Sequence, residues 1–127
     1  MNCAEALREA AARLGTTSDT ARLDAELLLA HALGVSRSQL LLRHLADPAP
    51  PAFAALVERR AQHEPVAYIL GEQAFFGLSL IVSPAVLIPR GDSEWVVEAA
   101  LDAAPALARV LDCGTGSGAL LLAVLAQ

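Results

Sequence analysis

The sequence predicts an α/β chain in three parts, and three observations along its 127 residues support this. Apolar residues recur at helical spacing through the first sixty or so positions, which predicts a helical bundle. Residues 74–88 are rich in β-branched and aromatic residues, with Gly77 and Pro84 between them, which favours a β-hairpin. Residues 109–127 read as an apolar strand, a glycine-rich loop and a helix, the start of a parallel sheet. We expect boundaries at 1–71, 72–88 and 89–127.

The helices of the bundle are predicted from their apolar stripes and their end signals. Gly15 and Gly34 are placed to cap the C-termini of the first two helices. Ser18 or Asp19 is expected to cap the second helix, and Ser36 the third. The connections are short, as antiparallel helical neighbours require.

Two further helices are expected on either side of the hairpin. Residues 52–62 form the first, with Phe53 facing inward and Arg59 and Arg60 facing solvent. Residues 94–103 form the second, capped by Asp92 or Ser93 and closed by Pro105. Aromatic residues of these segments are expected to pack in hairpin and helix contacts rather than to stack on a substrate: Tyr68, Phe75, Phe76 and Trp95.

Composition excludes several classes of protein. The net charge is −5, and all nine basic residues are arginine, so we expect no direct binding to nucleic acid. The apolar run 119–126 is shorter than the roughly 18 residues of a membrane span, so no membrane partner is expected. Cys3 and Cys113 lie far apart, which disfavours a disulfide framework or a zinc site and favours a cytoplasmic protein. Three histidines without shared spacing do not predict a metal site: His31, His44 and His63.

The glycine-rich loop is the candidate cofactor site. A strand over 109–113 leads into the loop, and a helix opens at Ala119, an order that presents backbone N–H groups to a nucleotide-like ligand. The charge of Asp112 disfavours a pyrophosphate beside it and favours the ammonium and sulfonium of S-adenosylmethionine. The chain has no lysine, which excludes a P-loop. The predicted cofactor-binding residues are Asp112, Gly114, Thr115, Gly116, Ser117 and Gly118.

A dinucleotide-binding oxidoreductase is the competing interpretation of the same loop. Gly114, Gly116 and Ala119 fit the Gly-x-Gly-x-x-Ala fingerprint of such enzymes. Asp112 disfavours this interpretation, for the charge reason above.

Several segments together resemble a known family. Residues 110–119 resemble motif I of class I S-adenosylmethionine-dependent methyltransferases. Residues 22–29, 64–71, 75–77, 82–84 and 86–94 are similar to segments of the HemK-type protein-(glutamine-N5) methyltransferases, in the same order. The resemblance covers essentially the whole chain. It implies an N-terminal helical bundle, a β-hairpin linker and the start of a Rossmann-like class I methyltransferase domain.

The resemblance also implies a reaction. The family transfers a methyl group from S-adenosylmethionine to the side-chain amide nitrogen of the glutamine in the Gly-Gly-Gln motif of peptide chain release factors. The helical bundle is expected to help dock the release factor, and the complete protein is expected to be a monomer. Two alternatives stay open: a glutamine methyltransferase acting on a ribosomal protein, and a helical interaction module without catalysis.

The family's catalytic signature, Asn-Pro-Pro-Tyr, is missing from these 127 residues. The only asparagine is Asn2, and no Pro-Pro-Tyr occurs. The acidic residue that would end a second strand and bind the ribose hydroxyls is missing as well. We therefore expect an N-terminal fragment that holds no catalytic residue and is inactive alone.

Overall fold

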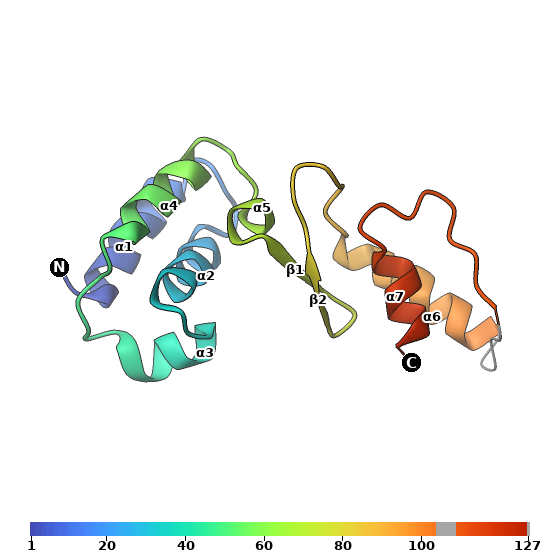
Figure 1. Cartoon of the computed structure of the whole chain (residues 1–127). Helices are drawn as coiled ribbons and strands as arrows, with labels where there is room; N and C mark the ends of the chain where they lie inside the picture. Colours follow the sequence, from blue (N-terminus) through green and yellow to red (C-terminus); the bar gives the residue numbers. More distant parts are fainter. Residues whose placement is uncertain (104–108, 127) are drawn as a thin grey trace. The chain divides into compact units, whose positions relative to one another are not determined.

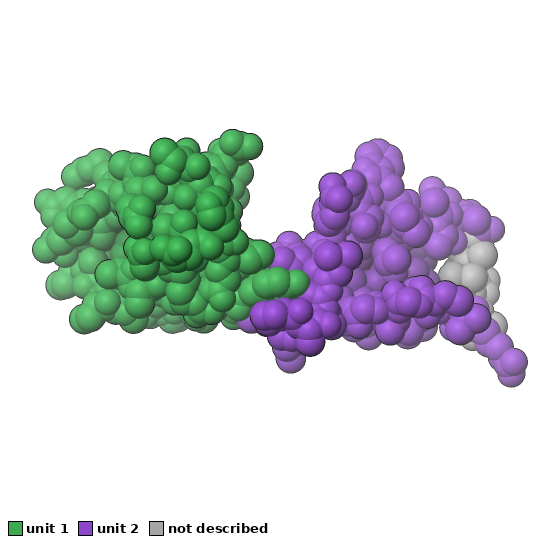
Figure 2. All heavy atoms as spheres, turned by 90° about the horizontal axis from the view of Figure 1, so that it is seen from above, with its two compact units in different colours: residues 1–70 green, residues 71–127 purple. Residues whose placement is uncertain are grey.

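The computed structural model describes residues 1–103 and 109–126. The chain divides into two compact units, residues 1–70 and residues 71–127, coloured separately in Figure 2. The described residues are mostly helical, with one two-stranded antiparallel sheet (Figure 1).

The first unit is the predicted helical bundle. Its apolar core gathers residues from α1, α2, α4 and α5, with Leu7, Leu28, Leu29 and Leu40 fully buried. The predicted inward position of Phe53 is confirmed, since 5% of it is exposed. The elements of the unit are α1 (Cys3–Leu14), α2 (Ala21–Leu33), α3 (Arg37–Gln39), a π-helix (Leu40–His44), α4 (Ala52–Ala61) and α5 (Val66–Leu70).

Two capping boxes begin helices in this unit. The Asn2 side chain accepts from the Glu5 backbone N–H, and the Glu5 carboxylate accepts from the Asn2 N–H. Ser36 and Gln39 form the same reciprocal pair at the start of α3, which confirms the predicted Ser36 cap. Each box satisfies two backbone donors that the first helical turn leaves unpaired.

The predicted caps around α2 are partly wrong. Gly34 ends α2 in the left-handed region at φ +72°, as expected. Gly15 is the C-cap of α1, as predicted, but it has a right-handed conformation at φ −59°, because the chain continues into a further turn after this residue. Neither Ser18 nor Asp19 caps α2: Thr20 stands at that position, and the Ser18 hydroxyl instead accepts from the Thr20 N–H.

The second unit contains the predicted hairpin, in shorter form. Its strands are β1 (Glu72–Phe75) and β2 (Leu78–Ile81), paired with Phe75 opposite Leu78. The remaining elements are a 3-10 turn (Gly91–Ser93), α6 (Glu94–Ala103) and α7 (Ala119–Leu125). The α6 bounds agree with those predicted, whereas Pro105 lies outside the described residues. A small core joins the hairpin to both helices through Phe75, Leu80, Val97, Ala119 and Ala123.

The predicted strand over 109–113 is not formed. These residues are irregular, and Leu111 is 87% exposed. A parallel strand is stabilised only when neighbours pair with it, and no described residue pairs with this segment. The structure therefore shows the hairpin, the loop and the two helices, and the Rossmann-like sheet stays a prediction.

The exposure of two side chains also differs from expectation: Trp95 was expected to pack in helix contacts, and Arg60 was expected to face solvent. Trp95 is 73% exposed on α6, so it does not pack in a core of the described chain. Arg60 was expected on a solvated face, but its side chain is only 17% exposed and pairs with Asp24. Both positions lie on amphipathic helices, where sequence spacing alone did not fix which side chains meet a partner.

Candidate functional site

The glycine loop lies directly before α7 and has a left-handed backbone conformation at each of its three glycines. Gly114, Gly116 and Gly118 all lie at positive φ, at +67°, +56° and +82°. This region is strained for residues with a Cβ, so the three alternating glycines are required by the loop's shape. A Cβ added at Gly114 or Gly116 would meet no heavy atom within 4 Å, so the space in front of both is open.

A short hydrogen-bond network holds the loop together. The Thr115 hydroxyl donates to the Asp112 carboxylate at 3.0 Å. The Gly118 N–H donates to the Thr115 carbonyl at 2.8 Å, immediately before α7 begins. Asp112 is half-buried and is thus tied to the loop even though the predicted strand before it is not formed.

A cavity of about 190 Å³ lies against this loop. Of the six predicted cofactor residues, four line it, while Asp112 and Gly118 do not. Pockets that enclose drug-sized ligands are usually about 300 Å³ or larger, so this cavity is smaller than one that would enclose such a ligand. The lining residues are Phe75, Leu87, Ile88, Pro89, Arg90, Ser93, Gly114, Thr115, Gly116, Ser117, Ala119 and Leu120.

Arg90 is a charged lining residue that the sequence analysis did not predict as part of the site. Its guanidinium lies 3.6 Å from the Asp92 carboxylate, and both side chains are largely exposed. A solvated ion pair of this kind is weak, so the guanidinium can also bind an anionic group of a ligand. The signal was present in the sequence, because residues 86–94 were among those that resemble the family.

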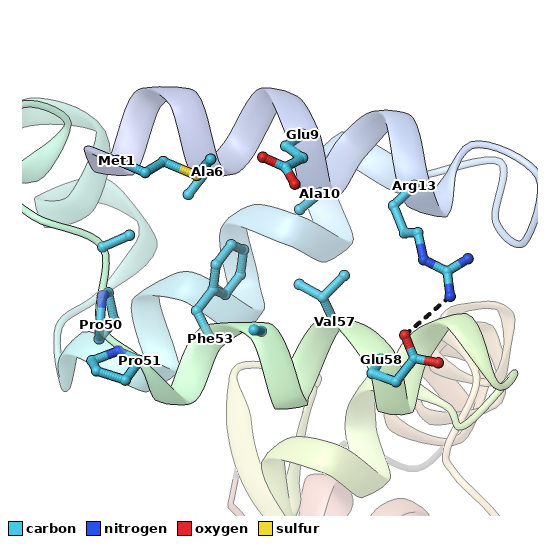
Figure 3. A pocket seen from close by; sticks show the side chains of 12 residues that line it. Met1, Ala6, Glu9, Ala10, Arg13, Pro50, Pro51, Phe53, Val57 and Glu58 are labelled. Carbon is cyan, nitrogen blue, oxygen red and sulfur yellow. Dashed lines mark hydrogen bonds and ion pairs between the residues drawn. The ribbon is translucent and has the colours of Figure 1, made fainter.

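A second hollow, of about 340 Å³, lies in the helical unit between α1 and α4. Figure 3 shows Phe53 and Val57 of α4 directed toward the α1 side, where Ala6 and Ala10 lie. An exposed ion pair between Arg13 and Glu58, 3.0 Å long, lies at one end (Figure 3). The groove is otherwise mainly apolar, and the sequence pattern did not reveal it because its two walls are more than thirty residues apart.

Two carboxylates of α2 are buried in this unit and paired with arginines. Asp24 accepts from Arg60 at 3.0 Å, which links α2 to the end of α4. Glu26 accepts from both Arg22 and Arg37 at 2.8 Å.

The ionisation of Glu26 is shifted by its surroundings. Burial on its own raises the pKa of Glu26, but the hydrogen bonds and charges of Arg22 and Arg37 outweigh it, so the pKa lies below its usual range. Glu26 is therefore ionised near neutral pH and forms a fixed part of the helical unit.

The remaining titratable groups do not assemble into a metal site. Among the described residues, no three His, Cys, Asp or Glu side chains cluster in a way that could hold a metal ion. His44 instead bonds to Asp47 at 2.7 Å. Within the same described residues, no helix is long and apolar enough to cross a membrane.

Comparison with known protein families shows the family of this chain. Residues 5–71, slightly more than half of the chain, match the family model described as the PrmC N-terminal domain. The chain belongs to this family. The matched range corresponds to the helical unit and its exit toward the hairpin.

Curated relatives extend the similarity beyond the helical unit. Release factor glutamine methyltransferase of Burkholderia pseudomallei is 45% identical over 132 aligned residues, which cover 100% of this chain and 46% of that protein. The protein of the same name from Geobacter sulfurreducens is 48% identical, covering 86% of this chain and 39% of the relative. That from Haemophilus influenzae is 42% identical, covering 100% and 48%. The chain thus spans about half the length of the curated relatives it matches, and the predicted resemblance is confirmed.

Proposed function

We propose that residues 1–127 are the amino-terminal part of a protein-(glutamine-N5) methyltransferase acting on peptide chain release factors. The complete enzyme would transfer the methyl group of S-adenosylmethionine to the side-chain amide nitrogen of the glutamine in a Gly-Gly-Gln motif. The observation that carries the cofactor half of this proposal is the glycine loop. Two of its three left-handed glycines, Gly114 and Gly116, line a cavity, and Thr115 and Ser117 line it as well, so four of the six residues expected to hold the cofactor lie against it.

The residues present fit the amino-acid end of S-adenosylmethionine. That end carries an ammonium and a carboxylate, and the bound cofactor supplies an electrophilic methyl group on its sulfonium. Asp112 does not line the cavity, but its bond to Thr115 holds a negative charge next to the residues that do. Arg90 offers a positive charge in the cavity lining. A pyrophosphate would instead place its two negative charges near Asp112, which disfavours a dinucleotide.

The chain's own contribution to the reaction is binding and positioning. An amide nitrogen is a poor nucleophile because its lone pair is delocalised into the carbonyl. Holding such a group in line with a methyl donor raises the rate through orientation. The helical unit would help to dock the release factor, and the groups that grip the glutamine would lie outside residues 1–127. We accordingly propose that residues 1–127 alone transfer no methyl group, and that the complete enzyme is a cytoplasmic monomer.

Cofactor binding tests the assignment directly. Calorimetric titration of the full-length natural protein should show binding of S-adenosylhomocysteine and none of NAD at the same concentration. Gly116→Ala should weaken that binding about tenfold, since an L-residue at φ +56° is strained by roughly 1–2 kcal/mol. Gly34→Ala is the matched control, because it introduces the same left-handed strain in the other unit. A preference for NAD would overturn the methyltransferase assignment.

Substrate choice needs a separate assay. Full-length protein, labelled S-adenosylmethionine and a release factor should yield label on the Gly-Gly-Gln glutamine, and none when that glutamine is replaced by alanine. Label on a ribosomal protein instead would select the ribosomal alternative. Tight binding of the release factor with no transfer at all would select the non-catalytic interaction module.

A further inference from the structure

The tip of the hairpin in the second unit is strained. Phe76 lies at φ +49° and Gly77 at φ +78°. A two-residue hairpin turn with both central residues at positive φ is type I′, and Asn-Gly is the pair that suits it best. A phenylalanine in the first of these positions is unfavourable, so surrounding contacts must hold it there.

One side chain supplies such a contact. The Glu94 carboxylate accepts a hydrogen bond from the Phe76 backbone N–H at 2.7 Å, in a partly buried setting. The strand pairing ends at Phe75 and Leu78, so the Phe76 N–H lies beyond the last paired residues. A carboxylate acceptor makes this bond charge-assisted and stronger than a bond between neutral groups.

The residue next to this turn forms part of the cavity wall. Phe75 is 1% exposed and lines the cavity together with loop residues 114–117. It packs in the same small core as Val97 of α6 and Ala119 of α7. Glu94 itself begins α6, directly after Ser93, which also lines the cavity. A single hydrogen bond therefore joins the hairpin tip to the start of α6 beside the cavity.

We propose that Glu94 is a positioning residue for this cavity. Its carboxylate holds the strained Phe76 turn and thereby keeps Phe75 in the wall that faces the glycine loop. The identity of the ligand rests on the function proposed above, whereas the hydrogen bond and its effect on the hairpin do not.

Ligand affinity tests the proposal in the full-length natural protein. Glu94→Ala should weaken S-adenosylhomocysteine binding about tenfold, which corresponds to about 1.4 kcal/mol. Glu94→Gln keeps an acceptor oxygen and should stay within about twofold of wild type. Glu98→Ala is the matched control, because Glu98 is an exposed glutamate one turn later on the same helix. Its affinity should equal that of wild type.

A second pair of variants separates positioning from the general effect of a charge at the start of α6. Glu94→Asp keeps the charge that favours a helix N-terminus but shortens the reach to Phe76. If the hydrogen bond matters, Asp fails to restore affinity and Gln restores it. The opposite order, or an unchanged affinity in Glu94→Ala, overturns the proposal.

A variant of the turn itself provides a second background in which Glu94→Ala can be tested. In a Phe76→Asn protein the turn becomes Asn-Gly, which adopts the type I′ conformation unaided. Glu94→Ala should then weaken binding by less than about threefold, since only part of the tenfold effect remains when the turn needs no support. An equal loss in both backgrounds contradicts the proposal. If the Glu94→Ala single variant does not fold, ligand affinity is compared between the Phe76→Asn variant and the double variant Phe76→Asn with Glu94→Ala.

Hydrogen exchange at the Phe76 amide distinguishes failure of this inference from failure of the proposed function. Glu94→Ala should speed exchange at that amide, and Glu94→Gln should not, with no ligand present. Exchange that is unchanged in Glu94→Ala refutes the hydrogen bond. Wild type that does not bind S-adenosylhomocysteine refutes the cofactor assignment and leaves the exchange result to decide the role of Glu94.

Discussion

Replacing Arg60 by methionine tests how the helical unit is held together. The change removes the guanidinium and keeps most of the aliphatic stem. Arg60 lies 3.0 Å from the Asp24 carboxylate, and their side chains are 17% and 8% exposed. Removing one partner of a buried ion pair costs about 3–5 kcal/mol, because the remaining charge is left without compensation. Since Thr20 still donates to Asp24, we expect the lower end, about 3 kcal/mol.

An exposed ion pair of the same unit gives the matched control. Arg13 pairs with Glu58 at 3.0 Å, but these side chains are 54% and 56% exposed. Arg13→Met should therefore cost no more than about 1 kcal/mol. Adding Asp24→Asn to Arg60→Met should recover part of the lost stability, because a neutral amide leaves no unpaired charge.

Native-state hydrogen exchange at α2 amides is the appropriate assay. Trp95 is the only tryptophan and lies in the second unit, so its fluorescence does not report on α2. The amides of Leu28 and Leu29, both fully buried residues of α2, report the opening free energy of the first unit. If Arg60→Met lowers that free energy no more than Arg13→Met does, the argument from burial is wrong.

Three other outcomes are expected from the same unit. Because the pKa of Glu26 is lowered in the folded state from a reference of 4.5, its stabilisation is present above about that pH and is lost as pH falls through the lower folded value. Glu26→Gln should flatten this acid dependence in urea titrations between neutral and acidic pH. Gly34→Ala should lower stability by about 1–2 kcal/mol, since its φ is +72°, while Gly15→Ala at φ −59° should be neutral or stabilising by up to about 1 kcal/mol. Leu28→Ala, fully buried, should cost about 2–5 kcal/mol, and Leu42→Ala, 82% exposed, less than about 0.5 kcal/mol. Chemical denaturation followed by circular dichroism checks the last two pairs.

Local sequence signals predicted several features whose interactions span only a few residues. The Ser36 cap involves partners three residues apart, and the left-handed Gly34 cap is set by the turn that it closes. The bounds of α6 follow from an apolar stripe with an acidic start. At Ser18 and Asp19 the same reasoning failed, because several polar residues compete at one helix start and Thr20 takes the position.

Contacts between distant residues were beyond local patterns. Asp24 and Arg60 are 36 residues apart, and an exposed or a paired arginine has the same appearance on a helical wheel. The hydrogen bond from Phe76 to Glu94 joins a hairpin turn to a helix 18 residues later. Nothing in the spacing of either pair predicts that the two segments meet. Arg90 likewise lines the cavity because of the path that the chain takes after Pro89, which the local spacing of residues does not predict.

The glycine loop and the segment before it show both cases within one motif. The loop conformation depends on nearby residues, whereas the predicted strand depends on distant ones. Gly114, Gly116 and Gly118 adopt positive φ although residues 109–113 form no strand. The loop's conformation is therefore encoded by its own glycines and by the bond from Thr115 to Asp112. A parallel strand has no such local code, because its hydrogen bonds lie entirely with neighbours. For the proposed enzyme, this means that the loop's conformation does not require a paired strand before it. The sheet would then supply the rest of the site rather than the loop's conformation.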